Sequence, residues 1–488
     1  MTSVTHEAAP ARVRALAWTP AYVFAATFAL GLAFSVKLLD PWEGWFLQVV
    51  SRVRAGEVLY RDVAYGAGPL PAYLAEGTTY LTSVDIIAVK LVVVAAFAGS
   101  ATLAWLVAGE LGIGLRGRLV VLAALAYVAP PLQQPPYAPL ATTFLLGALL
   151  AALRPGRTAA LAGGASCALA FCSKQNVGVY ALAALVLSAV VLRRALAAGW
   201  AAGTFAVVTG ALLLPVAVTG GLSRYVDYGF TGKGAYLHAP DPFASTLSGV
   251  VHTVTHVSSL AELDAAYWAL GFFLPALAAV SLLLLRPTRE TAVVVAFAAA
   301  GAATLYPRFD TAHVAYAAPP LVLLVAHSAR TKVPRALVVV ASLWVGIAVV
   351  LTASLPMRLA RSPNAVLSDL PHMRGTFVDR GRQDLWRREN AAVLALGRPL
   401  LLLVPDAGFR YLMTGLRNPT AFDFPFVTTF GKTGQERVVR ALASREITRV
   451  CVAGEWFGLE PTRIVNYVRT TMRPTRRLGF CRLYTAHP

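Results

Sequence analysis

Long apolar stretches separated by short polar turns make up most of the first 355 residues. A transmembrane helix needs roughly 20 mostly apolar residues, and the longer stretches meet that length. The pattern predicts an α-helical polytopic membrane protein with about 11 transmembrane helices. The candidate spans are residues 17–39, 85–109, 119–133, 138–153, 158–173, 177–192, 195–217, 267–286, 290–306, 313–328 and 336–355.

The charges in the turns alternate along the chain. One set of turns, taken with the N-terminal segment, holds 13 Lys and Arg against three acidic residues, Glu7, Glu110 and Glu290. An excess of Lys and Arg marks the cytoplasmic side of a membrane protein. We therefore expect the N-terminus in the cytoplasm and two long loops, residues 40–84 and 218–266, outside. An odd number of spans also places residues 356–488 outside.

Composition supports this interpretation. The chain is 57% hydrophobic and 14% charged, with a mean hydropathy of +0.62, whereas a soluble domain has about 45–50% apolar and about 25% charged residues. These values exclude an ordinary soluble protein. The first apolar run lacks a small-residue cleavage site, so we interpret it as a retained helix and not as a signal peptide.

The last part of the chain, residues 356–488, has a different pattern. RPLLLLVPDAG and ITRVCVAGEW predict short buried strands with helical patterns between them, hence a small extracytoplasmic α/β domain beside a membrane domain of residues 1–355. It carries 21 Lys and Arg against 10 Asp and Glu. Such charge beside a membrane indicates anionic lipid or glycan as a partner rather than nucleic acid.

The four cysteines have no zinc-site spacing. Cys167 and Cys172 lie in an apolar segment and are expected in a core. Cys451 and Cys481 lie in strand-like stretches of the C-terminal domain. In an extracytoplasmic domain they form either a disulfide or two buried thiols, and the sequence leaves both open.

Two carboxylates stand directly after the first span, in the stretch DPWEG. Asp40 and Glu43 share one face if the chain is helical there, and an apolar, aromatic environment favours a carboxylate that takes up a proton as general base. The structural alternative is a helix start, with Asp40 as N-cap, Pro41 as first helical residue and Glu43 in the first turn. The two interpretations are compatible.

Other polar stretches fall on the same expected outer side. Arg308 is a candidate phosphate ligand because a guanidinium binds phosphate bidentately, and Lys174 is a second, against the alternative of a lysine that only extends its ammonium toward water. The remaining candidates are, for phosphate binding, Arg61 and Lys233, and for the site in general Asp62, Gln175, Asn176, Tyr228, Asp310 and His313. For several of these the alternative is an ordinary polar loop or a helix-end ion pair.

Taken together, these motifs resemble those of the GT-C superfamily of integral-membrane glycosyltransferases, the bacterial family 39-like enzymes related to protein O-mannosyltransferases and aminoarabinose transferases. The resemblance rests on D-x-x-E-G, A-G-x-x-x-Y-R-D and G-P-L in the first loop, and on K-Q-N-x-G, P-R-F-D-x-x-H and P-D-A-G-F-R-Y-L-M-T-G further on. It covers residues from about 18 to about 425.

The resemblance implies transfer of a sugar from a polyprenyl-phosphate donor to a lipid, glycan or protein acceptor, at the outer face of a bacterial inner membrane. Asp40 matches the acidic position of the family's first outer loop. The family's adjacent Asp-Glu pair is absent, because Glu43 stands three residues on, so Asp40 is the first choice of base and Glu43 the second. Some relatives use a divalent metal such as Mg or Mn and others none, and the sequence leaves a cofactor open.

Two other functions compete with this one. A transporter or flippase of lipid-linked sugars is expected to carry ionisable residues inside its spans, whereas here Lys90 is the main one. A non-catalytic membrane scaffold for envelope assembly does not need the acidic first loop. Replacing Asp40 by Asn distinguishes all three, since only an enzyme loses sugar transfer while keeping its fold.

Overall fold

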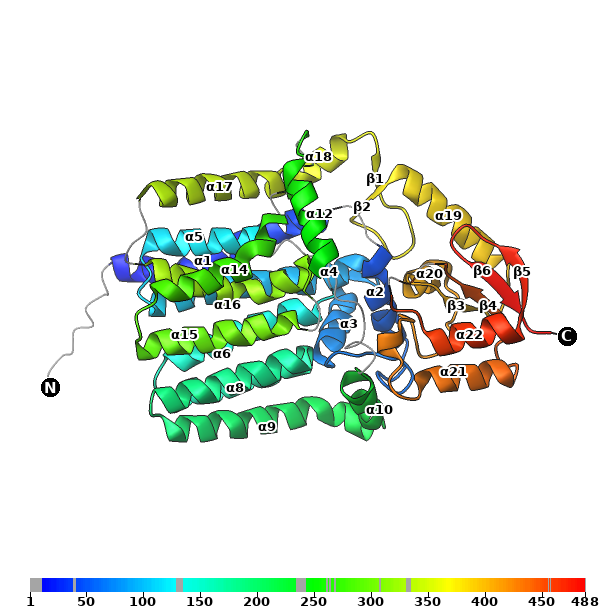
Figure 1. The fold of residues 1–488 in the computed structure, drawn as a ribbon, viewed down its shortest axis with the longest axis horizontal. Coiled ribbons are helices and arrows are strands. Elements are labelled where there is room, and N and C mark those ends of the chain that lie inside the picture. Colours follow the sequence, from blue (N-terminus) through cyan, green and yellow to red (C-terminus); the bar gives the residue numbers. More distant parts are fainter. Residues whose placement is uncertain are drawn as a thin grey trace, which may run out of the picture.

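The computed structural model describes residues 11–37, 41–128, 135–233, 243–259, 262, 265–266, 269–306, 309–330, 335–454, 456 and 458–487. A bundle of long helices forms one half of the molecule, and a smaller α/β unit lies at one end of it (Figure 1). The bundle helices are α1 (Ala11–Ser35), α4 (Ile86–Glu110), α5 (Leu115–Val128), α6 (Tyr137–Leu153), α7 (Arg157–Ser173), α8 (Gln175–Val191), α9 (Ala195–Val218), α14 (Leu274–Ser281), α15 (Arg289–Ala302), α16 (Thr311–Ala329) and α17 (Arg335–Ala353).

Each of the eleven predicted spans overlaps one of these helices, but the span predicted at residues 267–286 is divided into α14 and two short 3-10 stretches, Leu270–Phe273 and Leu282–Leu284. Three of the described helices, α4, α9 and α16, are long and apolar enough to cross a membrane. That all eleven cross remains a prediction. In α9, only 11% of the most apolar stretch is buried against protein, and exposed side chains such as Leu196, Val207 and Val218 cover its surface. An apolar face of this extent is stable against lipid and not against water.

The turns with the basic residues meet at the end of the bundle where the N-terminus lies (Figure 1). Arg154 forms an ion pair with Glu110 across two turns at 2.8 Å, and Arg330 donates a hydrogen bond to the Leu111 carbonyl at 2.8 Å. The structure therefore gathers one set of loops at one end, as the alternation of charges predicts.

Short helices occupy the other end, between the bundle and the C-terminal unit (Figure 1). They are α2 (Pro41–Arg54), α3 (Leu70–Thr82), α10 (Leu222–Gly229) and, in the second long loop, α12 (Phe243–Thr255). Helix α2 begins at Pro41, the residue expected to be first in the helix, because proline lacks the N–H that would be unpaired there.

The C-terminal unit begins with α18 (Leu355–Arg361) and a hairpin of β1 (Ala365–Leu367) and β2 (Phe377–Asp379). A four-stranded sheet of order β3–β4–β6–β5 follows, with β3 and β4 parallel and the other pairs antiparallel. Its elements are α19 (Arg380–Leu394), β3 (Leu401–Leu403), α20 (Ala407–Thr414), α21 (Gly434–Ala443), β4 (Arg449–Val452), α22 (Thr462–Thr471), β5 (Arg473–Arg477) and β6 (Arg482–Thr485).

The predicted strands thus appear as β3 and β4, and the expected α/β character is confirmed for the described residues. Cys451 and Cys481 are joined in a disulfide, which decides between the two states left open by the sequence. Cys167 and Cys172 are free and buried, as expected.

One hydrophobic core runs from the C-terminal unit into the loop of residues 40–84. It contains Phe46 and Val50 of α2 together with Leu402 and Phe409 of the C-terminal unit. Helices α2 and α20 cross at two glycines. A Cβ on Gly44 would lie 2.3 Å from the Phe409 ring, and a Cβ on Gly408 would lie 2.8 Å from the Trp45 Cα. The absence of side chains here lets the two helices pack at close range.

Candidate functional site at the junction of the bundle and the outer loops

The motifs of two separate loops lie together at the end of the bundle that faces the C-terminal unit. The Gly68 N–H donates to the Ser173 carbonyl at 3.2 Å, and the Gln175 side-chain nitrogen lies 3.5 Å from the Gly66 carbonyl oxygen. A Cβ on Gly68 would lie 2.0 Å from the Cys172 carbonyl oxygen, so only glycine fits at this contact. The G-P-L stretch and the K-Q-N stretch are therefore in direct contact.

Glu43 forms the centre of a buried group of charges. Its Oε1 lies 2.9 Å from the Lys37 Nζ and its Oε2 lies 3.3 Å from the Lys90 Nζ, and the three side chains are only 5%, 7% and 2% exposed respectively. Lys90 also donates to the Ser35 carbonyl at 2.8 Å. One carboxylate between two ammonium groups leaves an excess charge of +1 at the point where α1 ends and α2 begins.

This geometry limits the chemistry open to Glu43. Each of its carboxylate oxygens already lies against an ammonium group, and burying three charges is costly unless they are paired. Glu43 therefore holds two lysines in place more readily than it takes a proton from an acceptor. Asp40, the first choice of base, lies outside the described residues.

A second polar group contains three more of the expected residues. The Lys174 ammonium lies over the Tyr316 ring, 5.4 Å from its centroid, a cation–π distance. The Tyr316 ring in turn meets the His313 ring edge-on at 6.0 Å. Asp310 accepts hydrogen bonds from the backbone N–H of His313 at 2.9 Å and from its Nδ1 at 2.8 Å. Asp310 thereby caps α16 and orients His313.

The first loop is fixed to the C-terminal unit by Arg52. Its side chain reaches Asp423 at 2.8 Å and Glu57 at 2.6 Å. It also donates to the Asp62 carbonyl at 2.8 Å and the Thr420 carbonyl at 3.1 Å. Burial alone would lower the pKa of Arg52, but the nearby carboxylates of Asp423 and Glu57 together have the larger effect and raise this pKa above its ordinary value. The loop of residues 40–84 is thus bound to the C-terminal unit through Arg52.

Tyr228 has a comparable fixing role on α10. It is fully buried, and its hydroxyl accepts a hydrogen bond from Arg437 of the C-terminal unit at 2.9 Å. Nearby, the backbone N–H of Lys432 donates to Asp227 at 2.9 Å. The loop of residues 218–266 is therefore also bound to the C-terminal unit.

The other expected residues lie apart from these groups or outside the described part. Arg61 and Asp62 form an exposed ion pair at 2.9 Å, and the hydrogen bonds from Arg61 hold the pKa of Asp62 below its ordinary value. Asn176 lies in the first turn of α8, half-buried. Arg308 is not among the described residues, and Lys233 ends a short helix of Thr231–Lys233.

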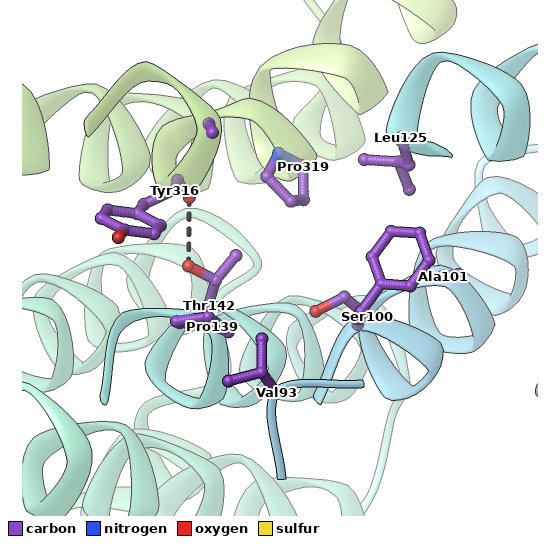
Figure 2. Close-up of a pocket in the computed structure, with 10 residues that line it drawn as sticks. Val93, Ser100, Ala101, Leu125, Pro139, Thr142, Tyr316 and Pro319 are labelled. Carbon is purple, nitrogen blue, oxygen red and sulfur yellow. Dashed lines mark hydrogen bonds between the residues drawn. The ribbon is translucent and has the colours of Figure 1, made fainter. Parts of the chain in front are cut away.

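A small pocket inside the bundle has Tyr316 in its wall (Figure 2). Its volume is about 40 Å³, and its lining includes Val93 and Phe97 of α4 and Pro139 of α6. Figure 2 shows the Thr142 hydroxyl donating to the Tyr316 carbonyl across it, at 3.0 Å. The pocket is too small for a sugar. It shows, however, that apolar space borders the contact between Lys174 and Tyr316.

Sequence reasoning missed Lys37 and Tyr316, and it treated Lys90 only as a charge inside a span. The desolvation cost of Lys90 in an apolar helix was the available signal, because such a residue needs a buried partner. Among the described residues, no group of three or more His, Cys, Asp or Glu side chains is placed to hold a metal ion.

Comparison with solved structures finds similar chains over nearly the whole length of this one. ArnT from Cupriavidus metallidurans in the apo state matches with a TM-score of 0.56 at 13% identity, covering 97% of this chain and 100% of ArnT. The same protein bound to undecaprenyl phosphate matches at 0.47 and 14% identity, covering 99% of this chain and 100% of that one.

The arabinofuranosyltransferase AftD from Mycobacteria matches at 0.49 and 14% identity, and this chain covers only 40% of its length. No protein-family model and no curated protein matches the sequence. ArnT is an aminoarabinose transferase and AftD an arabinofuranosyltransferase, both of the GT-C class. The match to apo ArnT, which extends over almost all of both chains, shows that this protein has the fold of the GT-C glycosyltransferases.

Proposed function

We propose that this protein is a membrane glycosyltransferase that transfers a sugar from a polyprenyl-phosphate donor to an envelope acceptor on the extracytoplasmic face. The observation that carries the proposal is the buried Lys37–Glu43–Lys90 group on a fold of the GT-C kind. Two of its members, Lys37 and Glu43, stand three positions before and after the expected base Asp40 in the sequence. Its excess positive charge suits a departing phosphate. ArnT has been crystallised with undecaprenyl phosphate, a compound of the same chemical class as the proposed leaving group.

The reaction needs two tasks from the protein. Asp40 takes the proton from the acceptor hydroxyl or amine as that group attacks the anomeric carbon of the sugar. The bond between the anomeric carbon and the phosphate oxygen breaks, and the polyprenyl phosphate leaves with the electron pair. Direct displacement inverts the anomeric configuration. Lysine or arginine groups then stabilise the charge that develops on the phosphate.

The structure supports an order among the phosphate candidates. Lys174 lies next to apolar space through Tyr316, which suits a ligand with a lipid tail, and Arg308 stays a candidate from its motif. Arg61 is engaged by Asp62 at the surface and is the weaker choice. No step is assigned to a divalent metal such as Mg or Mn. Adding a metal chelator to the transfer assay tests separately whether the reaction requires one.

The topology belongs to the same proposal. Residues 1–355 form the membrane domain and residues 356–488 an extracytoplasmic domain, with the N-terminus in the cytoplasm of a bacterial inner membrane. The basic turns at one end of the bundle and the disulfide at the other support this orientation, since disulfides persist in oxidising compartments. Cysteine labelling from each side of sealed vesicles tests it.

A transfer assay tests the function. Purified protein in nanodiscs receives a panel of radiolabelled polyprenyl-phosphate sugars with cell-envelope extract as acceptor. We expect transfer by the wild type and by the control Asp384→Asn, a carboxylate exposed on α19, and loss of transfer in Asp40→Asn with donor binding retained.

The competing functions give different results in the same assay. A flippase binds and moves donor across a sealed bilayer without transferring sugar, and Asp40→Asn leaves that unchanged. A scaffold neither binds donor nor transfers sugar. Either result overturns the proposal, provided that the panel covers hexose and pentose donors.

A further inference from the structure

A large crevice opens in the C-terminal unit at the carboxyl ends of its two parallel strands. Its volume is about 640 Å³, and its lining includes Val404 and Pro405 after β3, and Ala453 and Gly454 after β4. Ligands of open α/β sheets bind in the crevice outside the carboxyl ends of parallel strands. The volume also falls within the range of about 300–1,000 Å³ that small-molecule sites have.

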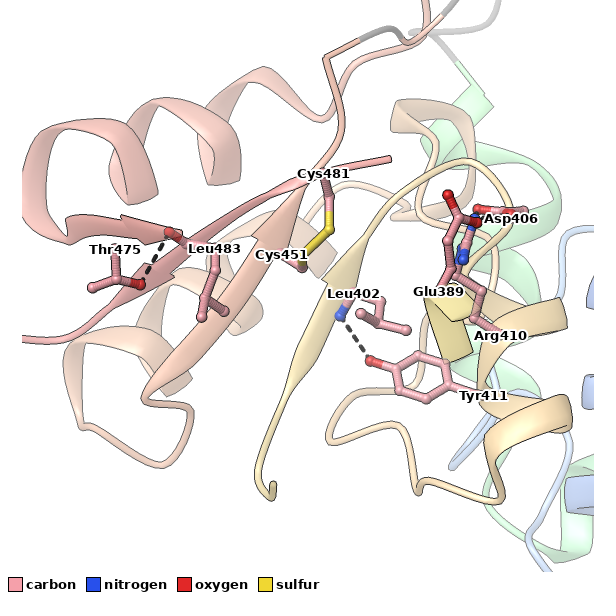
Figure 3. Close-up of a disulfide and its surroundings, with 9 residues drawn as sticks. All are labelled: Glu389, Leu402, Asp406, Arg410, Tyr411, Cys451, Thr475, Cys481 and Leu483. Atoms are coloured by element: carbon pink, nitrogen blue, oxygen red, sulfur yellow. Dashed lines mark hydrogen bonds and ion pairs between the residues drawn. A yellow bond between two sulfur atoms is a disulfide. The ribbon is translucent and has the colours of Figure 1, made fainter. Parts of the chain in front are cut away.

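Arg410 is one of the residues that line the crevice, and Figure 3 shows its side chain beside Asp406 and Glu389. This side chain is 4% exposed and lies 3.1 Å from Glu389 and 3.0 Å from Asp406. Its guanidinium also lies on the Phe480 ring, 3.5 Å from the centroid. Its Nη1 is buried and has no hydrogen-bond partner among the described residues. A buried donor of this kind is costly unless something pairs with it.

Three further arginines line the crevice: Arg469, Arg477 and Arg482. The side chain of Arg469 lies 3.3 Å from Glu460, whereas the residues Arg477 and Arg482 are exposed. Cys481 lines the same crevice, and its disulfide to Cys451 ties the β5–β6 turn to β4 (Figure 3). The wall that carries the arginines is thus covalently fixed to the sheet.

We propose that this crevice binds an anionic saccharide, a sugar that bears a carboxylate or a phosphate monoester. Asp406, which lines the crevice and is held by Arg410, accepts hydrogen bonds from sugar hydroxyls, and Glu389 holds Arg410 from the other side. Phe480 offers an apolar ring for the sugar's carbon face, and Arg477 and Arg482 bind the anionic group. The described residues thus combine an acidic floor, an aromatic wall and a basic rim, as this ligand requires.

A lipid headgroup fits the position less well than a glycan. The β5–β6 hairpin lies at the end of the molecule farthest from the N-terminus, beyond the helix bundle (Figure 1), where a headgroup of the same membrane does not reach. The crevice then holds part of the glycan that accepts the transferred sugar. This role rests on the proposed function, whereas the binding itself does not.

Binding is tested with the full-length protein in nanodiscs, by isothermal titration calorimetry or saturation-transfer NMR. The probes are glucuronate, glucose 6-phosphate, neutral glucose and inorganic phosphate. We expect at least one anionic sugar to bind about tenfold more tightly than glucose and than phosphate alone. The two anionic probes distinguish a carboxylate from a phosphate as the recognised group.

Neighbouring residues of β5 supply a matched pair of variants. Arg477 lines the crevice, whereas Arg476, its neighbour on the strand, does not, because successive side chains of a strand point to opposite faces. Arg477→Gln should weaken binding of the anionic sugar about tenfold and leave glucose unchanged, and Arg476→Gln should bind like the wild type.

Two results overturn the site. One is equal binding by the Arg477→Gln and Arg476→Gln variants, and the other is inorganic phosphate binding as tightly as the sugars, which indicates an anion site only. The binding experiment does not depend on transfer. If the protein binds the anionic sugar but shows no activity in the separate transfer assay, the binding site stands and the proposed function is wrong. If the protein transfers sugar but binds none of the saccharide probes, the proposed function stands and the binding site is wrong.

Discussion

Two buried groups of charges, one beside the bundle and one in the C-terminal unit, are opposites of each other. At the bundle, Glu43 lies between Lys37 and Lys90, and none of the three side chains is more than 7% exposed. In the C-terminal unit, Arg410 lies between Glu389 and Asp406, which are 12% and 19% exposed, and Arg410 and Asp406 line a crevice of about 640 Å³.

The difference lies in the sign of the excess charge and in access to water. The closed group has one positive charge in excess, which suits a phosphate in a low-dielectric place. The open group has one negative charge in excess, which suits sugar hydroxyls that arrive from water. Because water screens the second group more strongly than the first, equivalent substitutions should cost more at the bundle.

The largest effect is expected from Glu43→Gln. It leaves two buried ammonium groups without the carboxylate between them, which should lower the free energy of unfolding by about 3–5 kcal/mol. Thermal and denaturant unfolding in detergent micelles measure it. The matched control is Glu110→Gln, whose pair with Arg154 is exposed and whose loss should cost about 1 kcal/mol or less. Equal losses of stability in the two variants would contradict the claim that Glu43 lies in a buried group of charges.

A smaller loss is expected from Arg410→Met. The two carboxylates lose their shared partner but are partly exposed to water, so we expect a loss of about 2–3 kcal/mol in the same measurement. Arg417→Met is the control, because Arg417 is 80% exposed and lies 3.8 Å from its nearest acidic partner, Glu57. If Arg410→Met costs more than Glu43→Gln, the contrast between a closed and an open group is wrong.

The next prediction concerns the contact that joins the two regions. Gly408→Ala places a methyl group 2.8 Å from the Trp45 Cα, and the resulting shift should cost about 1–3 kcal/mol. Hydrogen exchange should increase in α2 and α20 together. Gly203→Ala on α9, where no atom lies within 4 Å of the added Cβ, should be neutral or slightly stabilising. Faster exchange in α20 alone would show that the regions are not coupled there.

The smallest effect is expected at the exposed Arg61–Asp62 pair. Because the pKa of Asp62 is held below its ordinary value, the carboxylate stabilises the fold above the ordinary aspartate pKa of about 4 and loses this contribution as pH falls below it. Asp62→Asn should therefore lower the melting temperature slightly at pH 7 and less at pH 4, down to equality at still lower pH. A difference that grows on acidification would contradict the assigned direction.

The sequence predicts the helices well and their partners poorly. Hydropathy identified the helical segments because each is a local property, and Pro41 marked the start of α2. The meeting of Lys37, Glu43 and Lys90 depends on how α1, α2 and α4 pack, which no local pattern encodes. Similarly, Arg52 looks like an ordinary loop arginine until Asp423 is brought beside it at 2.8 Å.

The candidate site shows the same division. The K-Q-N and P-R-F-D-x-x-H motifs pointed to Lys174 and His313, and the structure connects them through Tyr316. Nothing in the sequence distinguished Tyr316 from other aromatic residues of the spans. The P-D-A-G-F-R stretch is one of the motifs of the family resemblance, but the burial of Arg410 between two acids follows from the fold alone.

The most direct test of the account is a single-turnover assay with one radiolabelled polyprenyl-phosphate sugar that the wild type is shown to bind. The account predicts that Asp40→Asn binds this donor as the wild type does and transfers its sugar on the order of 10²–10⁴ times more slowly. Transfer by Asp40→Asn at the wild-type rate would contradict the assignment of the base, and donor bound without any transfer by the wild type would contradict the enzyme.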